Sequence, residues 1–435
     1  MQDESCYTYK DRFPDCNTEI ADKAGSQNGQ YMVIRKKNFL RKEVYHLEWN
    51  PQISPINVLK ISGFVPHTGV TAAGILFSAV VPEGRRAFLL LYEKGSPEVR
   101  ATIPFPEDQN LGRVRAMIVS GIPASELEYN FMIGNEIVTD PAAQLVVGLE
   151  KFADPGRRAC RMAAERGEEG KVTAHQIRGA FIDGSFDWGE KETFLKIPYS
   201  RSVFYELHVR GFTKSKTSKV RCKGTYLGLT EKIPYLKELG VTALVLMPAY
   251  EFDEVAKDDE DPRAGWRPEK LRELPDGDAQ VQDGTVRLNY WGYGKGWFFA
   301  PKSSYSYSKQ AADEYREMVR ELHRSGIEVI MEMNFPEGTD PAFMQTCLLW
   351  WRQIYHVDGF MLIGSQEDIN SVSKSPALCD VKLISDYYDT KRMYPKGREG
   401  SFRNLAEYNA GFRNDARKFL KGDPYSLHAL LYRSR

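Results

Sequence analysis

The feature that most limits the fold of this chain is an alternation of continuous apolar runs and segments with helical spacing between residues 203 and 384. Apolar runs without interspersed polar residues are typical of strands that are buried on both faces. Strands that alternate with helices along the chain predict a parallel α/β architecture. The predicted strands are 203–212, 241–247, 327–333, 357–363 and 381–384, and the predicted helices are 230–239, 310–324 and 343–355.

The chain before this region has a different pattern. Residues 31–150 hold short apolar runs, such as 75–81 and 87–92, which turn residues such as Pro82 and Gly84 separate. This spacing predicts an all-β sandwich. The predicted organisation is a flexible polar N-terminus at 1–30, the sandwich at 31–150, a linker at 151–200 and the α/β domain at 201–435, with a charged surface excursion at 253–283.

Composition excludes several classes of function. Lys plus Arg and Asp plus Glu both number 59, so the net charge is zero and nucleic acid is not an expected partner. No run reaches the ~18 apolar residues of a membrane helix. The six cysteines lack C-x-x-C spacing and the seven histidines lack metal-ligand spacing, so we predict no metal, no cofactor and no disulfide framework. Reduced thiols and the absence of a secretory signal at residues 1–5 predict a cytoplasmic protein.

Three runs in the α/β region carry specific motifs. Residues 205–213 read Tyr-Glu-Leu-His-Val-Arg-Gly-Phe-Thr, residues 289–293 read Asn-Tyr-Trp-Gly-Tyr, and residues 357–363 read Val-Asp-Gly-Phe-Met-Leu-Ile. They resemble the catalytic barrel of isoamylase- and pullulanase-type debranching enzymes in the α-amylase superfamily, glycoside hydrolase family 13. The resemblance implies a (β/α)8 TIM barrel, an α-glucan polysaccharide or oligosaccharide as ligand, and hydrolysis of α-1,6-glucosidic links as the family reaction.

The predicted sandwich carries a resemblance of its own. Residues 69–71, Phe77, 89–92, 129–131 and 139–142 are similar to the immunoglobulin-like module that precedes the barrel in glycogen-branching and -debranching enzymes, a family-48-type carbohydrate-binding-like module. The implied fold is therefore an α/β protein in which an all-β sandwich precedes the barrel. An unrelated sandwich is the alternative that the motif alone leaves open.

The departures from the family pattern concern the catalytic positions. The family's fourth strand reads V-D-G-F-R-F-D, where the Arg orients the nucleophile and the last Asp is the nucleophile. Here Met361 and Ile363 take those two places. At the third strand Glu332 replaces an Asp and Glu337 replaces a sugar-binding His. Asp386 matches the general acid/base Glu, and it is the candidate catalytic residue that remains.

Aromatic residues are the candidates for sugar binding. Tyr293 matches the residue on which the family stacks a glucose ring, and Trp291 and Trp297 flank it. Stacking and packing are both open for Tyr293, whereas packing is the expectation for the two tryptophans. Trp266 is expected to anchor a loop. His208 is expected to be a hydrogen-bonded barrel residue rather than a metal ligand.

The chain also looks too short for a complete barrel. After Asp389 the sequence predicts only helices, at 404–419 and 425–432, so strands six to eight of the family have no place. An incomplete barrel leaves an open edge that the last helices, a partner or a second copy would have to cover.

Three functional hypotheses follow. The first is a catalytically impaired homologue, a pseudoenzyme, that retains glucan binding or serves an enzyme partner. The second is an active O-glycosyl hydrolase in which Glu332 or Glu337 forms a relocated carboxylate pair with Asp386. The third is a relic fragment without a function of its own.

Overall fold

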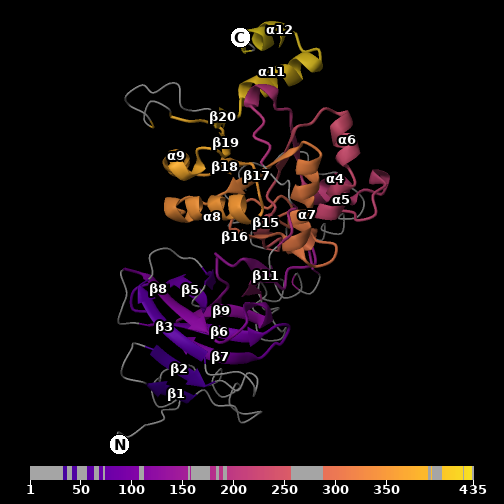
Figure 1. Ribbon diagram of the computed structural model, residues 1–435. Helices are drawn as coiled ribbons and strands as arrows, with labels where there is room; N and C mark the ends of the chain where they lie inside the picture. Colours follow the sequence, from indigo (N-terminus) through magenta and orange to yellow (C-terminus); the bar gives the residue numbers. More distant parts are fainter. Residues whose placement is uncertain are drawn as a thin grey trace, which may run out of the picture.

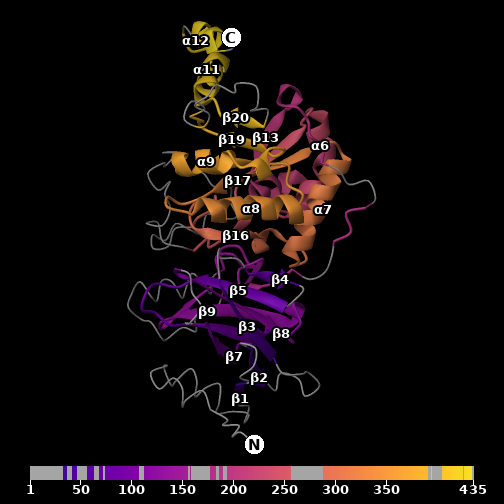
Figure 2. The ribbon, with the colours of Figure 1, turned by 60° about the vertical axis from the view of Figure 1, so that its left-hand side comes forward.

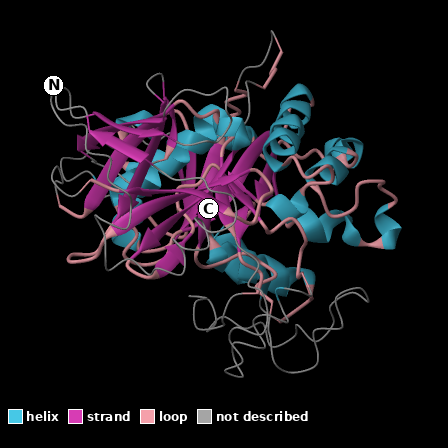
Figure 3. Cartoon of the chain, turned by 90° about the horizontal axis from the view of Figure 1, so that it is seen from below, coloured by secondary structure: helices cyan, strands magenta, loops and turns pink. Residues whose placement is uncertain are grey.

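The computed structural model separates the chain into a region of antiparallel sheets and an α/β region (Figures 1 and 2). It describes residues 33–36, 42–46, 56–62, 68–71, 74–106, 112–154, 157, 177–182, 186–189, 194–255, 288–389, 393, 404–424 and 426–433. The predictions for 1–30, for Trp266 and for most of 253–283 lie outside these residues. Within the described residues, the α-helices of the α/β region lie between residues 209 and 433; Figure 3 draws helices in cyan and strands in magenta.

Two antiparallel sheets form the amino-terminal region. The first has the order β1-β2-β3-β8-β5-β4, and the second has the order β11-β12-β9-β6-β7 with β10 paired to β9. Side chains from both sheets share one buried cluster, which includes Phe77, Leu89, Met117 and Phe131, so the sheets pack face to face as a sandwich. The strands are β1 (Val33–Lys36), β2 (Lys42–His46), β3 (Ile56–Ser62), β4 (Gly69–Thr71), β5 (Gly74–Val80), β6 (Ala87–Glu93), β7 (Val99–Pro104), β8 (Val114–Ser120), β9 (Leu127–Ile133), β10 (Glu136–Val138), β11 (Leu145–Val147) and β12 (Arg178–Ala180).

The α/β region is built on a six-stranded parallel sheet with the order β13-β14-β17-β18-β19-β20. Each strand pairs with the next one along the sheet, as in a barrel, and within the described residues β13 and β20 do not pair with each other. The sheet is therefore a curled half-barrel. Its strands are β13 (Phe204–Leu207), β14 (Ala243–Leu246), β17 (Glu328–Asn334), β18 (Gly359–Ile363), β19 (Lys382–Ser385) and β20 (Leu405–Glu407).

The helices of this region connect or follow the strands. They are α4 (Val209–Lys214), α5 (Tyr226–Thr230), α6 (Ile233–Glu238), α7 (Ala311–Arg324), α8 (Pro341–Ile354), α9 (Gln366–Ser373), α11 (Ala410–Leu420) and α12 (Ser426–Arg433). The start of helix α8 is specified by an N-cap residue and a proline. The Asp340 carboxylate accepts hydrogen bonds from the backbone N–H groups of Ala342 and Phe343, and Pro341 occupies the first helical turn.

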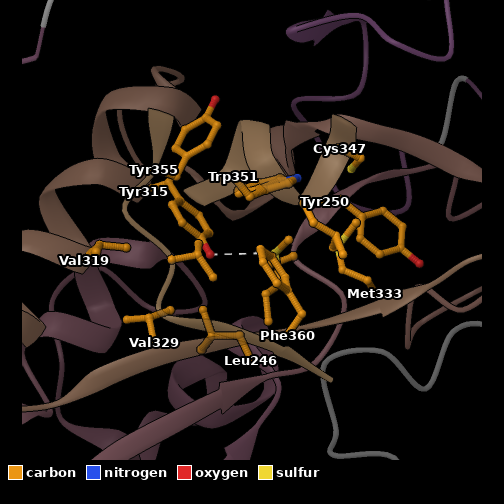
Figure 4. Close-up of a cluster of buried hydrophobic side chains, with 14 of the residues drawn as sticks. Leu246, Tyr250, Tyr315, Val319, Val329, Met333, Cys347, Trp351, Tyr355 and Phe360 are labelled. Atoms are coloured by element: carbon orange, nitrogen blue, oxygen red, sulfur yellow. Dashed lines mark hydrogen bonds between the residues drawn. The ribbon is translucent and has the colours of Figure 1, made fainter. Parts of the chain in front are cut away.

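One face of the parallel sheet is the helix-covered face. Val329, Leu246 and Phe360 of the sheet pack there against Tyr315 of α7 and Trp351 of α8, and all five are fully buried (Figure 4). The Trp351 indole N–H donates a 2.6 Å hydrogen bond to the carbonyl of Phe298 on β16 (Gly296–Pro301), which pairs with β15 (Tyr250–Phe252). This core fixes the positions of the strands and thereby of the residues at their ends.

The other face of the parallel sheet, the inner face, is less well covered. Its buried cluster holds Ala243, Val245, Ile330 and Ile384, and Tyr199, Met361 and Ala406 contact it while only partly buried. A complete barrel would enclose these side chains. In the half-barrel they line the inside of the curl.

The structure corrects three of the predicted elements. The strand predicted at 203–212 ends at Leu207, because the His208 ring caps α4 by accepting a hydrogen bond from the backbone of Gly211. The helix predicted at 404–419 is preceded by β20, which pairs in parallel with β19, so a sixth strand is present where none was expected. Strand β12 lies within the predicted linker 151–200.

Candidate functional site

The candidate site lies on the inner face, at the carboxyl ends of the parallel strands. Val329, Met331 and Met333 of β17 belong to the helix-covered core. Because side chains alternate along a strand, Glu332 and Asn334 face the inner side. Polar residues at the ends of such strands are where barrel proteins place their chemistry.

The strand register arranges these positions in layers. Glu332 is level with Met361, and Met361 with Ile384. One step further, Asn334 is level with Ile363. Asp386 lies in an exposed bend directly after the end of β19, the strand that pairs with β18 on the side away from β17. Ile363, which is half-buried, is the residue of β18 in this second layer.

Tyr293 makes hydrogen bonds through both its phenol and its backbone carbonyl. Its phenol donates a 2.7 Å hydrogen bond to Oε2 of Glu332, which is buried. Its carbonyl accepts from Nδ2 of Asn289 at 3.0 Å, and the Asn289 Oδ1 accepts from the backbone N–H of Gly292 at 2.9 Å. The ring stays half-buried, so it is accessible in part.

The turn before Tyr293 requires a glycine at position 292. Its φ is +79°, and a Cβ atom there would lie 2.4 Å from Cε1 of the buried Phe252 ring. Only glycine has the conformational freedom and the size that this turn requires. The loop that presents Tyr293 is therefore specified locally.

His208 is buried beside the same loop. Its Nδ1 accepts a 2.9 Å hydrogen bond from the backbone of Gly211, and its Nε2 lies 3.0 Å from the carbonyl of Tyr290 and 3.0 Å from the Tyr305 hydroxyl. Burial lowers the pKa of His208 from 6.5 to about 4. A neutral ring with its proton on Nε2 satisfies both sides, as expected for a hydrogen-bonded barrel residue.

Two tryptophans near the loop pack against other groups. Trp291 makes edge-to-face contacts with the rings of His208 and Tyr290, at centroid distances of 5.6 and 5.1 Å. Trp297 packs against the core of the sandwich. These contacts account for both indoles as packing groups, and the proposed substrate-binding role of Trp291 stays a prediction.

The described residues contain no group of three or more His, Cys, Asp or Glu side chains that could hold a metal ion. Cys222, Cys347 and Cys379 are free thiols. In the same part of the chain, no helix is long and apolar enough to cross a membrane.

Comparison with known proteins places this geometry in a family. No protein-family profile matches the chain. The chain is 27% identical over 412 residues to isoamylase 3, chloroplastic, of Oryza sativa subsp. japonica. That alignment covers 76% of this chain and 48% of the rice protein. The chain is 26% identical over 399 residues to a glycogen operon protein GlgX homolog of Haemophilus influenzae, with 76% and 55% covered. The glycogen debranching enzyme of Dickeya chrysanthemi is 29% identical over 304 residues, with 56% and 42% covered.

Solved structures agree on the fold. A pullulanase from Paenibacillus barengoltzii in complex with maltohexaose and alpha-cyclodextrin superposes with a TM-score of 0.57 at 18% identity, over 81% of this chain and 58% of that one. The chain is a debranching-enzyme-like protein of glycoside hydrolase family 13. It spans about half the length of the curated relatives it matches.

The layer that holds Ile363 can be compared with the groups that a glycosidase needs. Retaining glycosidases of this type need two carboxyl groups ~5–5.5 Å apart, one as nucleophile and one as acid/base. In this layer Ile363 supplies a hydrocarbon and Asn334 an amide, and Asp386, exposed after the end of β19, carries a carboxyl group. Glu337 lies beyond the end of β17 and is exposed.

Two residues at or just after the ends of β17 and β19 were not singled out from the sequence. Asn334 is almost fully buried at the end of β17, and Tyr387 is 53% exposed directly after Asp386. A signal for Asn334 was present, because Glu328, Glu332 and Asn334 interrupt the apolar run at even-numbered positions and so mark one face of the strand. No comparable pattern marks Tyr387.

Proposed function

We propose that this debranching-like protein binds α-glucans at the carboxyl ends of the half-barrel strands and does not hydrolyse them through the family's carboxylate pair. The observation that carries the proposal is the placement of Ile363 level with Asn334, where the family has its nucleophile. An isoleucine side chain cannot form a glycosyl-enzyme intermediate. Met361, at the place of the orienting Arg, removes positioning as well.

Binding has independent support from the groups that remain. Tyr293 keeps a partly accessible ring, held by Glu332, and Tyr387 adds an exposed ring beside Asp386. Aromatic rings bind the apolar faces of sugars without any catalytic group. The relatives named as isoamylases and glycogen debranching enzymes make α-glucans the ligand class to test first.

The proposal extends to the other parts of the chain. We propose that the sandwich, at 31–150 with β12 added, is an immunoglobulin-like, family-48-type module that adds glucan affinity, and that the half-barrel at 201–435 is a partial (β/α)8 barrel. A cytoplasmic location agrees with the free thiols of the described residues, although several plant relatives are chloroplastic. A partner or second copy at β13 or β20 would cover the open edges.

The active alternative rests on Asp386 with a relocated carboxylate. Glu332 is unsuited to this role, because its side chain is buried and already accepts a hydrogen bond from the Tyr293 hydroxyl. Glu337 is the remaining candidate, and its exposed position past the strand lacks the fixed geometry that paired carboxyls need.

The experiment is incubation of the purified chain with glycogen and with pullulan, following reducing-end release and co-sedimentation together. Co-sedimentation without release is the expected result. Release that disappears in the Asp386→Asn variant would establish the active alternative instead. Absence of both binding and release would refute glucan binding and leave a partner-dependent scaffold or a relic.

A further inference from the structure

Asn334 carries an unused hydrogen-bond donor at the candidate site. The residue is 3% exposed, and its Nδ2 has no hydrogen-bond partner within the described part of the chain. A buried donor without a partner costs roughly 1–3 kcal/mol. Such a group in a functional site points to a partner that arrives from outside.

The surroundings of Asn334 restrict what that partner can be. Asn334 shares its layer with Ile363, and Met361 lies in the layer below on the same strand. These two half-buried hydrocarbon side chains, here called the floor, are next to Asn334 in the register of β17 and β18. Asp386 follows the end of β19, which pairs with β18 on the side away from β17.

A sugar ring fits this combination of groups. It offers hydroxyl oxygens as acceptors around its edge and C–H groups on its faces, whereas an anion would gain little from a floor without positive charge. Two charged side chains are replaced by Met361 and Ile363, so the floor favours a neutral ring over one that carries charge at the anomeric carbon.

We propose that Asn334 is a specificity-determining residue of the glucan site, where its Nδ2 donates a hydrogen bond to a hydroxyl oxygen of a glucosyl unit lying over Ile363 and Met361. The inference rests on the proposed glucan binding and names a contact within it. A site built to hydrogen-bond a hydroxyl rejects ligands without one, because its own polar group is then left unpaired.

The test uses opposite effects on binding and on stability. Asn334→Leu keeps a similar size and removes the amide. The affinity for maltohexaose, measured by isothermal titration calorimetry on the full chain, is expected to fall about tenfold. The midpoint of urea unfolding is expected to stay unchanged or to rise, because an unpaired buried donor has been removed. A residue with a purely structural role would lower both quantities.

Two controls keep the test decisive. Tyr355→Phe removes another buried polar atom without a partner in the described part of the chain, the Tyr355 hydroxyl on the helix-covered face, and its affinity for maltohexaose is expected to stay at the wild-type value. Asn334→Val provides a second variant if the leucine does not fit. Wild-type affinity in a folded Asn334 variant would overturn this inference and leave glucan binding in place, whereas failure of the wild-type chain to bind would refute the proposed function itself.

Discussion

The two faces of the parallel sheet differ in how much of the family pattern they keep. On β18, Phe360 and Leu362 point into the helix-covered core and are fully buried, while Met361 and Ile363 point to the inner face and are half-buried. Phe360 matches the family pattern and Leu362 replaces one apolar residue by another, whereas Met361 and Ile363 stand where the family pattern has an Arg and an Asp. The requirements of folding and of catalysis are therefore separable within a single strand, since alternate side chains serve different purposes.

The largest expected effect comes from the helix-covered face. Trp351→Ala removes a fully buried indole that packs on Tyr355 at a centroid distance of 4.5 Å and donates to Phe298. We expect the free energy of unfolding to fall by about 4 kcal/mol, as measured by urea denaturation. The matched variant on the inner face, Met361→Ala, is expected to cost about 1 kcal/mol, because its side chain is only half-buried. Equal losses for the two variants would remove the distinction between the faces.

A pH-dependent loss of stability of similar size is expected from His208, the residue that follows β13. The ordinary pKa of His208 is 6.5 and burial lowers it to about 4 in the folded chain. Between these values the unfolded chain binds more protons than the folded one, so stability is present above pH 6.5 and is lost as the pH falls toward 4. For this group alone the loss is about 3 kcal/mol.

The His208→Asn variant isolates this contribution. Asparagine is a good N-cap and keeps an acceptor for the Gly211 N–H, but it does not titrate. The free energy of unfolding of both proteins should be measured by urea denaturation at a series of pH values from 4 to 7. It should fall less steeply with decreasing pH in the variant than in the wild type. Identical slopes would mean that His208 is not the titrating group.

The strands that could be predicted from the sequence are those that are buried on both faces. The buried runs on β14, β17, β18 and β19 were predictable because burial on both faces leaves an unmistakable apolar pattern. Strand β20 was missed because its three residues are half-buried or exposed and sit directly before a helix with strong helical spacing. Pairing with β19, a tertiary interaction, defines it rather than local preference.

The candidate site was predictable only in part for a related reason. Motif comparison located Ile363, Asp386 and Tyr293 along the chain. It could not show that Glu332 accepts a hydrogen bond from the Tyr293 hydroxyl. Nor could it show that Nδ2 of Asn334 has no hydrogen-bond partner within the described residues. Those facts depend on strand register and loop geometry, which bring distant residues together.

A smaller effect is expected from the hydrogen bond between Tyr293, in the loop after Asn289, and Glu332 on β17. Tyr293→Phe keeps the ring and removes the donor to the buried Glu332 carboxyl group. A buried carboxyl oxygen that loses a hydrogen-bond donor costs roughly 1–3 kcal/mol, so the free energy of unfolding should fall by about that amount. A fall in stability with glucan affinity largely kept would assign the hydroxyl to loop anchoring. If affinity fell and stability did not change, the hydroxyl would instead be a direct sugar contact.

The smallest expected effect tests whether the exposed rim of the inner face contributes to binding at all. Tyr387 is 53% exposed and Tyr307, in the turn before α7, is 60% exposed, so alanine at either position should leave stability almost unchanged. Tyr387→Ala should weaken maltohexaose binding about fivefold, or ~1 kcal/mol, because a stacking surface beside Asp386 is lost. Tyr307→Ala should bind like the wild type. Equal affinities for the two variants would place the sugar away from Asp386, so that the ligand would contact only the Tyr293 side of the inner face.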